Sequence, residues 1–423
     1  MRIKTVSVRL LLGTFALLMG TTVNAQKTKP YAGTTITVLL PPWSTLPKSM
    51  LDRFTKTSGI QVNLQTLGWD DIRAKIVTSM VAGSAPADVT EVDWSWVGQF
   101  GAANWYTPLN GLLDKSLVSD LAPASIFTYK NQLIAAPYFN DYRVLIFNKA
   151  MFAKAGVTAL PTTPQALTAA ATLIKQKGIS KFPIGVPLSA TEGTSTAWYL
   201  LTKAFGGELF TADFKPLFTS PSSAGYKALK WELDALKAGL IDPAQTGLTD
   251  VQTQEAFKAG KIAIDLAGWA GNLPVYNDTK KSKIAGQATA LLFPHVGPKT
   301  RTIGLPGAMG IPSNAQNKGA AAEFIKWWLQ PSNGEQIFSD LGMLPTRTTI
   351  LQSLNKKGKL QSGPTLLTQL AGVEPLFAGG TPEWYPQFSS GVAATINQAA
   401  KGQLTVDQAV SQIAQAAQKA QQR

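Results

Sequence analysis

Short hydrophobic runs alternate with amphipathic stretches along the first hundred residues. Thr35–Leu40 combines apolar and β-branched residues, a pattern that predicts a buried strand. Apolar positions at helical spacing over residues 46–57 predict a helix next. The alternation continues with a strand over 60–64, a helix over 70–82 and a strand over 87–92. Such alternation is typical of a mostly parallel sheet that is covered by helices.

A tryptophan follows each of these three predicted strands. Trp43 comes after the first strand, Trp69 after the second, and Trp94 after the third, directly behind Asp93. Ligands of open α/β sheets bind outside the carboxyl ends of the strands. Leucine, isoleucine or valine would be the commoner choice for core packing at such positions. The pattern therefore predicts a ligand site with aromatic walls at this edge of the sheet.

The N-terminus has the pattern of a secretory signal. Basic residues precede a short apolar stretch, and small or compact residues at 23–25 precede Gln26. This order predicts a cleaved signal peptide over residues 1–25, although an uncleaved anchor is the alternative. The chain has no cysteine, which excludes disulfides, thiolate metal sites and a lipoprotein anchor. We therefore expect a mature protein that is free in the periplasm.

Charge and motifs exclude several classes of function. The formal net charge is +14, but the basic residues are scattered, which favours a solvated basic surface over a nucleic-acid partner. The single histidine, His295, cannot build a histidine-rich zinc site, and no nucleophile elbow accompanies it. The glycine-rich stretch 304–310 lacks dinucleotide-binding spacing, and no phosphate-binding loop occurs. We expect no catalytic residues, no metal and no cofactor.

Five segments, in this order, carry a family resemblance: 81–89, 144–149, 256–264, 308–312 and 396–409. Together they resemble the family 1 extracellular solute-binding proteins of ABC importers, particularly the sugar-binding, maltose-type members. The resemblance implies a type II periplasmic-binding-protein fold, in which two α/β lobes enclose a ligand cleft and close about a hinge.

The resemblance also implies a division of the chain. One lobe would comprise residues 26–136 plus 307–345, and the other residues 141–302 plus 350–423. The hinge would lie near 136–141 and 303–311, with a further crossing near 345–350.

The side chains expected in the cleft suit a sugar. Aromatic faces match the C–H face of a sugar ring, and carboxylates or a guanidinium pair with its hydroxyl rim. We expect aromatic faces from Trp43, Trp94 and Trp269, and polar clamps from Asp93, Asp141 and Arg347. Tyr142 and Trp384 are further candidates, and the helix entry at Glu192, Thr196 and Trp198 could border the cleft.

The resemblance implies a monomeric, non-enzymatic binder that captures a mono- or oligosaccharide and delivers it to ABC permease subunits. Two alternatives stay open. The basic chain could bind an anionic or phosphorylated sugar instead. Asp93 and Asp141 could also form the carboxylate pair of a secreted glycosidase.

Overall fold

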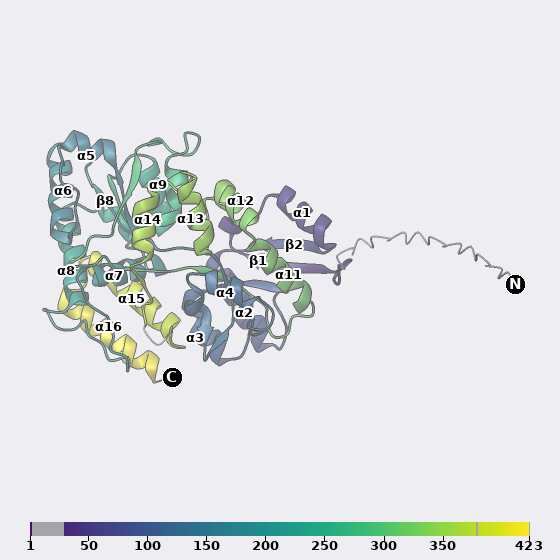
Figure 1. Cartoon of the computed structure of the whole chain (residues 1–423). Helices are drawn as coiled ribbons and strands as arrows, with labels where there is room; N and C mark the ends of the chain where they lie inside the picture. The colour runs from purple at the N-terminus through teal and green to yellow at the C-terminus, as the bar shows by residue number, and fades with distance from the viewer. Residues whose placement is uncertain (2–28, 378–379, 423) are drawn as a thin grey trace.

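The structure, a computed structural model, describes residues 1, 29–377 and 380–422. The predicted signal segment, apart from Met1, lies outside the described residues. Two α/β bodies make up the described chain (Figure 1), one around a five-stranded sheet and one around a four-stranded sheet. We refer to them as the first and second lobes. No helix in the described ranges is long and apolar enough to cross a membrane.

The sheet of the first lobe has the strand order β2-β1-β3-β12-β6. Its strands are β1 (Thr35–Leu40), β2 (Gln61–Thr66), β3 (Val89–Asp93), β6 (Ala136–Phe139) and β12 (Gly307–Gly310). β1 pairs in parallel with β2 and β3, as the strand–helix alternation predicts. β12 is antiparallel to both β3 and β6. The sheet therefore draws strands from three distant parts of the chain.

Amphipathic helices cover this sheet. They are α1 (Lys48–Ser58), α2 (Trp69–Val81), α3 (Val97–Ala102), α4 (Lys115–Asp120), α11 (Lys318–Trp328) and α12 (Pro331–Leu341). The predicted helices over 46–57 and 70–82 are thus confirmed to within two residues. Phe54 of α1 packs edge to face on Phe324 of α11, with 5.3 Å between ring centroids. This contact joins the first helix to one that lies late in the sequence (Figure 1).

The second lobe departs from the expected parallel sheet. Its order is β10-β7-β9-β8, built from β7 (Arg143–Asn148), β8 (Ile184–Gly185), β9 (Ile264–Trp269) and β10 (Ala288–Leu291). β7 is antiparallel to both β9 and β10, and only β8 with β9 is parallel. The apolar run that predicts β7 does not indicate whether the strand is parallel or antiparallel to its neighbours. That depends on pairing with residues more than a hundred positions away.

The remaining helices belong with this sheet. They are α5 (Lys149–Ala155), α6 (Pro164–Gln176), α7 (Glu192–Ala204), α8 (Ala224–Lys237), α9 (Asp250–Lys258), α10 (Leu273–Tyr276), α13 (Thr348–Lys356), α14 (Gly363–Leu370), α15 (Tyr385–Ala400) and α16 (Val406–Gln421). α7 is buried from Thr194 to Ala204. The short strands β11 (Thr302–Ile303) and β13 (Val373–Glu374) pair in parallel beside it.

The chain crosses between the lobes in two paired segments. Tyr142 bridges Gly304 in an antiparallel manner, and the Leu305 amide donates to the Asp141 carbonyl at 2.6 Å. A third segment lies alongside, since the Asn140 amide donates to the Leu344 carbonyl at 2.7 Å. Asn140, Asp141, Gly304 and Leu305 fall inside the predicted crossings, Tyr142 and Leu344 one residue outside them; the hinge itself and the lobe boundaries stay predictions.

Glu232 is a buried carboxyl inside the second lobe. Glu232 lies on α8 and is fully buried. Neither of its carboxyl oxygens has a hydrogen-bond partner among the described residues. Burial raises its pKa to about 8, because the charged form would lose its hydration. Folding at neutral pH therefore requires this group to take up a proton, which costs stability.

Glu232→Gln is expected to raise the melting temperature by several degrees at pH 8 and by much less at pH 5. The wild-type carboxyl is protonated when folded and ionised when unfolded between its two pKa values, so its cost grows with pH over that range. Thermal denaturation at both pH values measures the difference. Glu255→Gln, at an exposed carboxylate, is the control. Equal gains for Glu232→Gln at both pH values would contradict this account.

Candidate functional site

Asp93 ends β3 and points its carboxylate toward three donors. Oδ1 accepts from the Ser95 amide at 2.9 Å and from the Ser95 hydroxyl at 2.5 Å, and Oδ2 accepts from Trp69 Nε1 at 3.1 Å. The first bond caps the short helix Trp94–Trp96 that follows the strand. Asp93 is thereby fixed at the carboxyl end of a central strand, where the sequence pattern predicts a ligand site.

Trp94 contacts the opposite lobe. It is 4% exposed, and its ring lies 4.9 Å from that of Tyr385, the first residue of α15. The Tyr385 hydroxyl donates to Glu192, which opens α7, and the Ser389 hydroxyl donates to the other Glu192 oxygen at 2.7 Å. The lobes therefore touch across their interface, and Glu192 lies on the second-lobe side of the contact.

A second group of polar side chains lies where the chain enters the second lobe. Arg143 Nη2 lies 3.3 Å from Asp141 Oδ2, and Arg143 Nη1 donates to the Ala267 carbonyl at 3.0 Å. The Arg143 guanidinium carbon also lies 5.2 Å from the ring centre of Trp269. Arg143 and Trp269 are paired residues of β7 and β9, so the sheet register brings them together.

Three buried polar atoms in this second group have no partner within the described part of the chain. They are Asp141 Oδ1, Arg143 Nε and Trp269 Nε1. Buried polar atoms are nearly always hydrogen-bonded, and an unpaired one costs about 1–3 kcal/mol. One acceptor and two donors left together are what a bound molecule with several hydroxyl groups would satisfy.

The charge of Asp93 reaches carboxyl groups of the crossing segment and of the second lobe. Burial raises the pKa of Asp93 to about 6, although hydrogen bonds from Ser95 and Trp69 oppose the change. Burial likewise raises the pKa of Asp141 to about 6, with Arg143 opposing the increase and the charges of Asp250 and Asp93 adding to it.

Glu192 belongs to the same carboxyl group. Burial raises its pKa to about 7, and the charge of Asp93 adds to that increase, while hydrogen bonds from Tyr385 and Ser389 oppose it. Asp93 therefore influences carboxyls that are supplied by the hinge and by the second lobe. In the described ranges, no group of histidine, cysteine, aspartate and glutamate is arranged to hold a metal ion.

The structure brings together four of the eight residues predicted from the sequence. Asp93 and Trp94 come from the first lobe, Asp141 from the crossing segment and Trp269 from the second lobe. We define these four with Arg143 and Glu192 as the cleft site. Ligand binding by the predicted residues remains a prediction.

Tyr142 and Trp384 pack elsewhere in the second lobe. Tyr142 is fully buried, and its hydroxyl donates to the Leu366 carbonyl at 2.9 Å. Trp384 lies among aromatic rings, with centroids 5.5 Å from Phe214 and 5.7 Å from Phe377. These contacts account for both side chains as packing residues.

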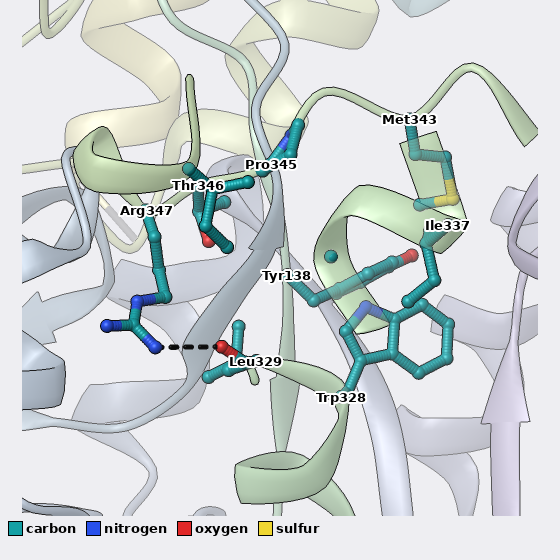
Figure 2. A pocket seen from close by; sticks show the side chains of 10 residues that line it. Tyr138, Trp328, Leu329, Ile337, Met343, Pro345, Thr346 and Arg347 are labelled. Carbon is teal, nitrogen blue, oxygen red and sulfur yellow. Dashed lines mark hydrogen bonds between the residues drawn. The ribbon is translucent and has the colours of Figure 1, made fainter. Parts of the chain in front are cut away.

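Arg347 and Trp43 also lie apart from the cleft site. Arg347 Nε donates to Asp120 at 2.7 Å, and its Nη1 donates to the Leu329 carbonyl at 3.2 Å. It borders a small pocket of about 10 Å³ beside Tyr138 and Trp328 (Figure 2). Trp43 is 39% exposed just beyond β1. The contacts of Arg347 identify it as a partner of Asp120 and of a helix end.

Arg143 and Tyr385 are cleft-side residues that the sequence reasoning missed. Arg143 stands two positions after Asp141, and residues two apart in an extended segment project to the same side. The spacing of Asp141 and Arg143 therefore indicates that the two side chains lie on the same side of the chain. Tyr385 gave no comparable signal, because it reaches Glu192 across 193 positions of sequence.

Comparison with known proteins agrees with this architecture. The sequence profile described as bacterial extracellular solute-binding protein matches residues 41–335. A probable amino-acid ABC transporter periplasmic-binding protein of Sinorhizobium fredii is 22% identical over 334 residues, which cover 76% of this chain and 73% of the relative. A mannitol-binding protein of Pseudomonas aeruginosa is 24% identical over 365 residues, with 80% and 81% covered.

A solved structure matches over nearly its whole length. The ABC transporter solute-binding protein of Thermotoga lettingae, crystallised with α-D-tagatose, superposes with a TM-score of 0.81. The two sequences are 26% identical, and the match covers 92% of this chain and 99% of the other. With the profile match across more than half of its residues, this chain belongs to the bacterial extracellular solute-binding proteins.

Proposed function

We propose that this protein binds a small, neutral, polyhydroxylated solute, a monosaccharide or polyol, in the cleft site. The observation that carries the proposal is the set of unpartnered buried atoms on Asp141, Arg143 and Trp269. Members of this family bind solutes without transforming them, which removes the glycosidase alternative. The relatives that bind tagatose and mannitol support the choice of a polyol or sugar.

The chemistry of the site suits hydroxyl groups. Asp141 Oδ1 can accept from one hydroxyl, while Arg143 Nε and Trp269 Nε1 can donate to others. One face of the Trp269 ring already carries the Arg143 guanidinium. If Trp269 stacks on a sugar, as the sequence predicts, it must use the face of the ring that Arg143 does not cover. The indole N–H of Trp269 could also donate a hydrogen bond to the solute.

The charge of the site favours a neutral solute over an anionic one. Asp93, Asp141 and Glu192 surround the space, whereas Arg143 is already paired with Asp141. A phosphate or carboxylate would be placed beside three acidic groups with one shared cation. The positive net charge of the chain is therefore weak support for an anionic ligand, because the surplus lysines and arginines do not line the cleft site.

The family membership extends this proposal to transport. We propose that the mature chain, released by cleavage after residue 25, diffuses in the periplasm as a monomer. The solute bridges both lobes and shifts the population toward the closed arrangement. That arrangement then delivers the solute to the permease subunits of an ABC importer.

A calorimetric panel tests the solute class. We expect saturable binding of at least one neutral compound among tagatose, mannitol, ribitol, glucose and maltose, and none of glucose 6-phosphate. Maltose is the disaccharide of the panel. Binding of maltose in preference to the monosaccharides and polyols would indicate an oligosaccharide site. Binding of glucose 6-phosphate or of an α-amino acid, with no neutral sugar or polyol bound, would overturn the proposal.

Asp141→Asn is expected to weaken binding of the identified solute by about 10- to 100-fold, since it removes a charged acceptor from a buried hydrogen bond. Asp120→Asn is the matched control, because Asp120 is also paired with an arginine but lies outside the cleft site. Calorimetry on both variants, after their folding is checked by thermal denaturation, gives the comparison. Unchanged affinity in Asp141→Asn would exclude this role for Asp141.

Solute affinity is expected to fall by about tenfold between pH 8 and pH 5. Solute hydroxyls donate best to ionised carboxylates, so bound solute lowers the raised pKa values of Asp93, Asp141 and Glu192. The free protein then holds more protons than the complex, and acid favours the free form. Dissociation constants across this range measure the slope. Affinity that rises toward pH 5 would contradict the assignment of these groups as acceptors.

A further inference from the structure

We propose that Gly98 is a positioning residue for solute binding. Because it has no side chain, the first lobe can seat directly on the backbone of residues 381–383 of the second lobe when the lobes close on a solute. A side chain at position 98 would hold the lobes apart and weaken binding without touching the solute. This inference rests on the proposed function, since closure on a solute is part of that function.

Gly98 makes a backbone contact between the lobes. It is the second residue of α3 and is buried. A Cβ atom at this position would overlap the Thr381 carbonyl oxygen, and would lie 2.6 Å from the Pro382 carbonyl carbon and 2.8 Å from the Glu383 nitrogen. In Figure 1 the start of α15 accordingly lies beside α3. All three neighbours are backbone atoms, which cannot rotate away as the end of a flexible side chain can.

The segment that meets α3 is anchored in the second lobe. The Tyr385 amide donates to the Pro382 carbonyl at 3.1 Å, and the Tyr385 hydroxyl donates to Glu192 of α7. The Trp384 ring packs edge to face on Phe210, with 5.7 Å between centroids. The segment cannot shift without disturbing this packing, so separation of the lobes is the cheaper way to accommodate a side chain at position 98.

α3 is a direct continuation of the cleft site. Asp93 caps the short helix Trp94–Trp96, and this helix runs without a break into α3. The Trp94 ring meets the Tyr385 ring 4.9 Å away, so the ring contact and the glycine contact join the same two stretches of chain. A solute that holds Asp93 against the second lobe therefore also holds Gly98 against the segment before Tyr385.

Alanine at position 98 affects the separated and the joined lobes differently. The three atoms nearest to a Cβ at Gly98 all belong to the second lobe, and the glycine has no positive φ. Alanine favours a helix over glycine and reduces the conformational entropy of the unfolded chain. With the lobes apart, Gly98→Ala is therefore neutral or stabilising. With the lobes joined, the added methyl group overlaps the opposite backbone.

Gly101 gives a contrast within the same helix. A Cβ atom there would lie 2.7 Å from the Cβ atom of Tyr129, which belongs to the first-lobe hairpin of β4 (Thr128–Tyr129) and β5 (Gln132–Leu133). Gly101→Ala therefore creates an overlap inside one lobe. It should lower the melting temperature of the solute-free protein, which Gly98→Ala should not do.

Gly98→Ala is expected to weaken binding of the identified solute by about tenfold, while the melting temperature of the solute-free protein stays the same or rises. Calorimetry and thermal denaturation on the full mature chain measure the two quantities. Gly111→Ala is the matched control, because Gly111 is exposed and a Cβ there meets no atom within 4 Å. Unchanged solute affinity in Gly98→Ala, or a lowered melting temperature of its solute-free form, would overturn the proposal.

A second measurement needs no solute. The chain has no cysteine, so Lys115→Cys on α4 and Lys227→Cys on α8, both exposed, can carry one spin label on each lobe. The distance distribution between the labels should contain a population with joined lobes that Gly98→Leu removes. Identical distributions with and without Gly98→Leu would overturn the role of Gly98. A calorimetric panel without any bound solute would instead overturn the proposed function.

Discussion

The pairing of two crossing segments at the hinge is the constraint on which the rest of the structure depends. Tyr142 bridges Gly304, and Leu305 donates to the Asp141 carbonyl. This short antiparallel contact ties the two crossing segments together where the chain passes between the lobes. Neighbouring side chains have different surroundings here, since Asp141 pairs with Arg143 in the cleft site and Asn140 lines a separate cavity of about 420 Å³.

The cleft site brings together carboxyl groups from the first lobe, the crossing segment and the second lobe. Burial raises the pKa values of Asp93, Asp141 and Glu192, and the charge of Asp93 adds to the increase at Asp141 and Glu192, so their ionised forms are costly in this arrangement. Hydroxyl donors from a solute would relieve that cost, and separation of the lobes would relieve it by hydration.

The predictable parts of this protein are the local ones. The run 35–40 and the helical spacing over 46–57 depend on nearby residues, and the structure confirms both. Asp93 and Trp94 could be placed at the exit of a strand, because the end of a strand is itself a local feature. The maltose-type resemblance supplied Trp269 and the lobed architecture, which short-range patterns do not contain.

The unpredictable parts depend on contacts between distant residues. Arg347 pairs with Asp120 across 227 positions. The residues around position 347 contain no pattern that predicts Asp120 as its partner. The antiparallel direction of β7 depends on β9, more than a hundred residues away. Arg143 precedes an apolar strand run, and its contact with Trp269 depends on the pairing of β7 with β9. Distant pairing, and not local propensity, decides which polar side chains meet in the cleft.

Native mass spectrometry of the protein purified from its own periplasm tests the central claim most directly. The account predicts a folded monomer that carries one neutral monosaccharide or polyol, lost on denaturation and absent from Asp141→Asn prepared in the same way. A co-purified phosphorylated sugar, amino acid or other charged solute in that site would contradict it.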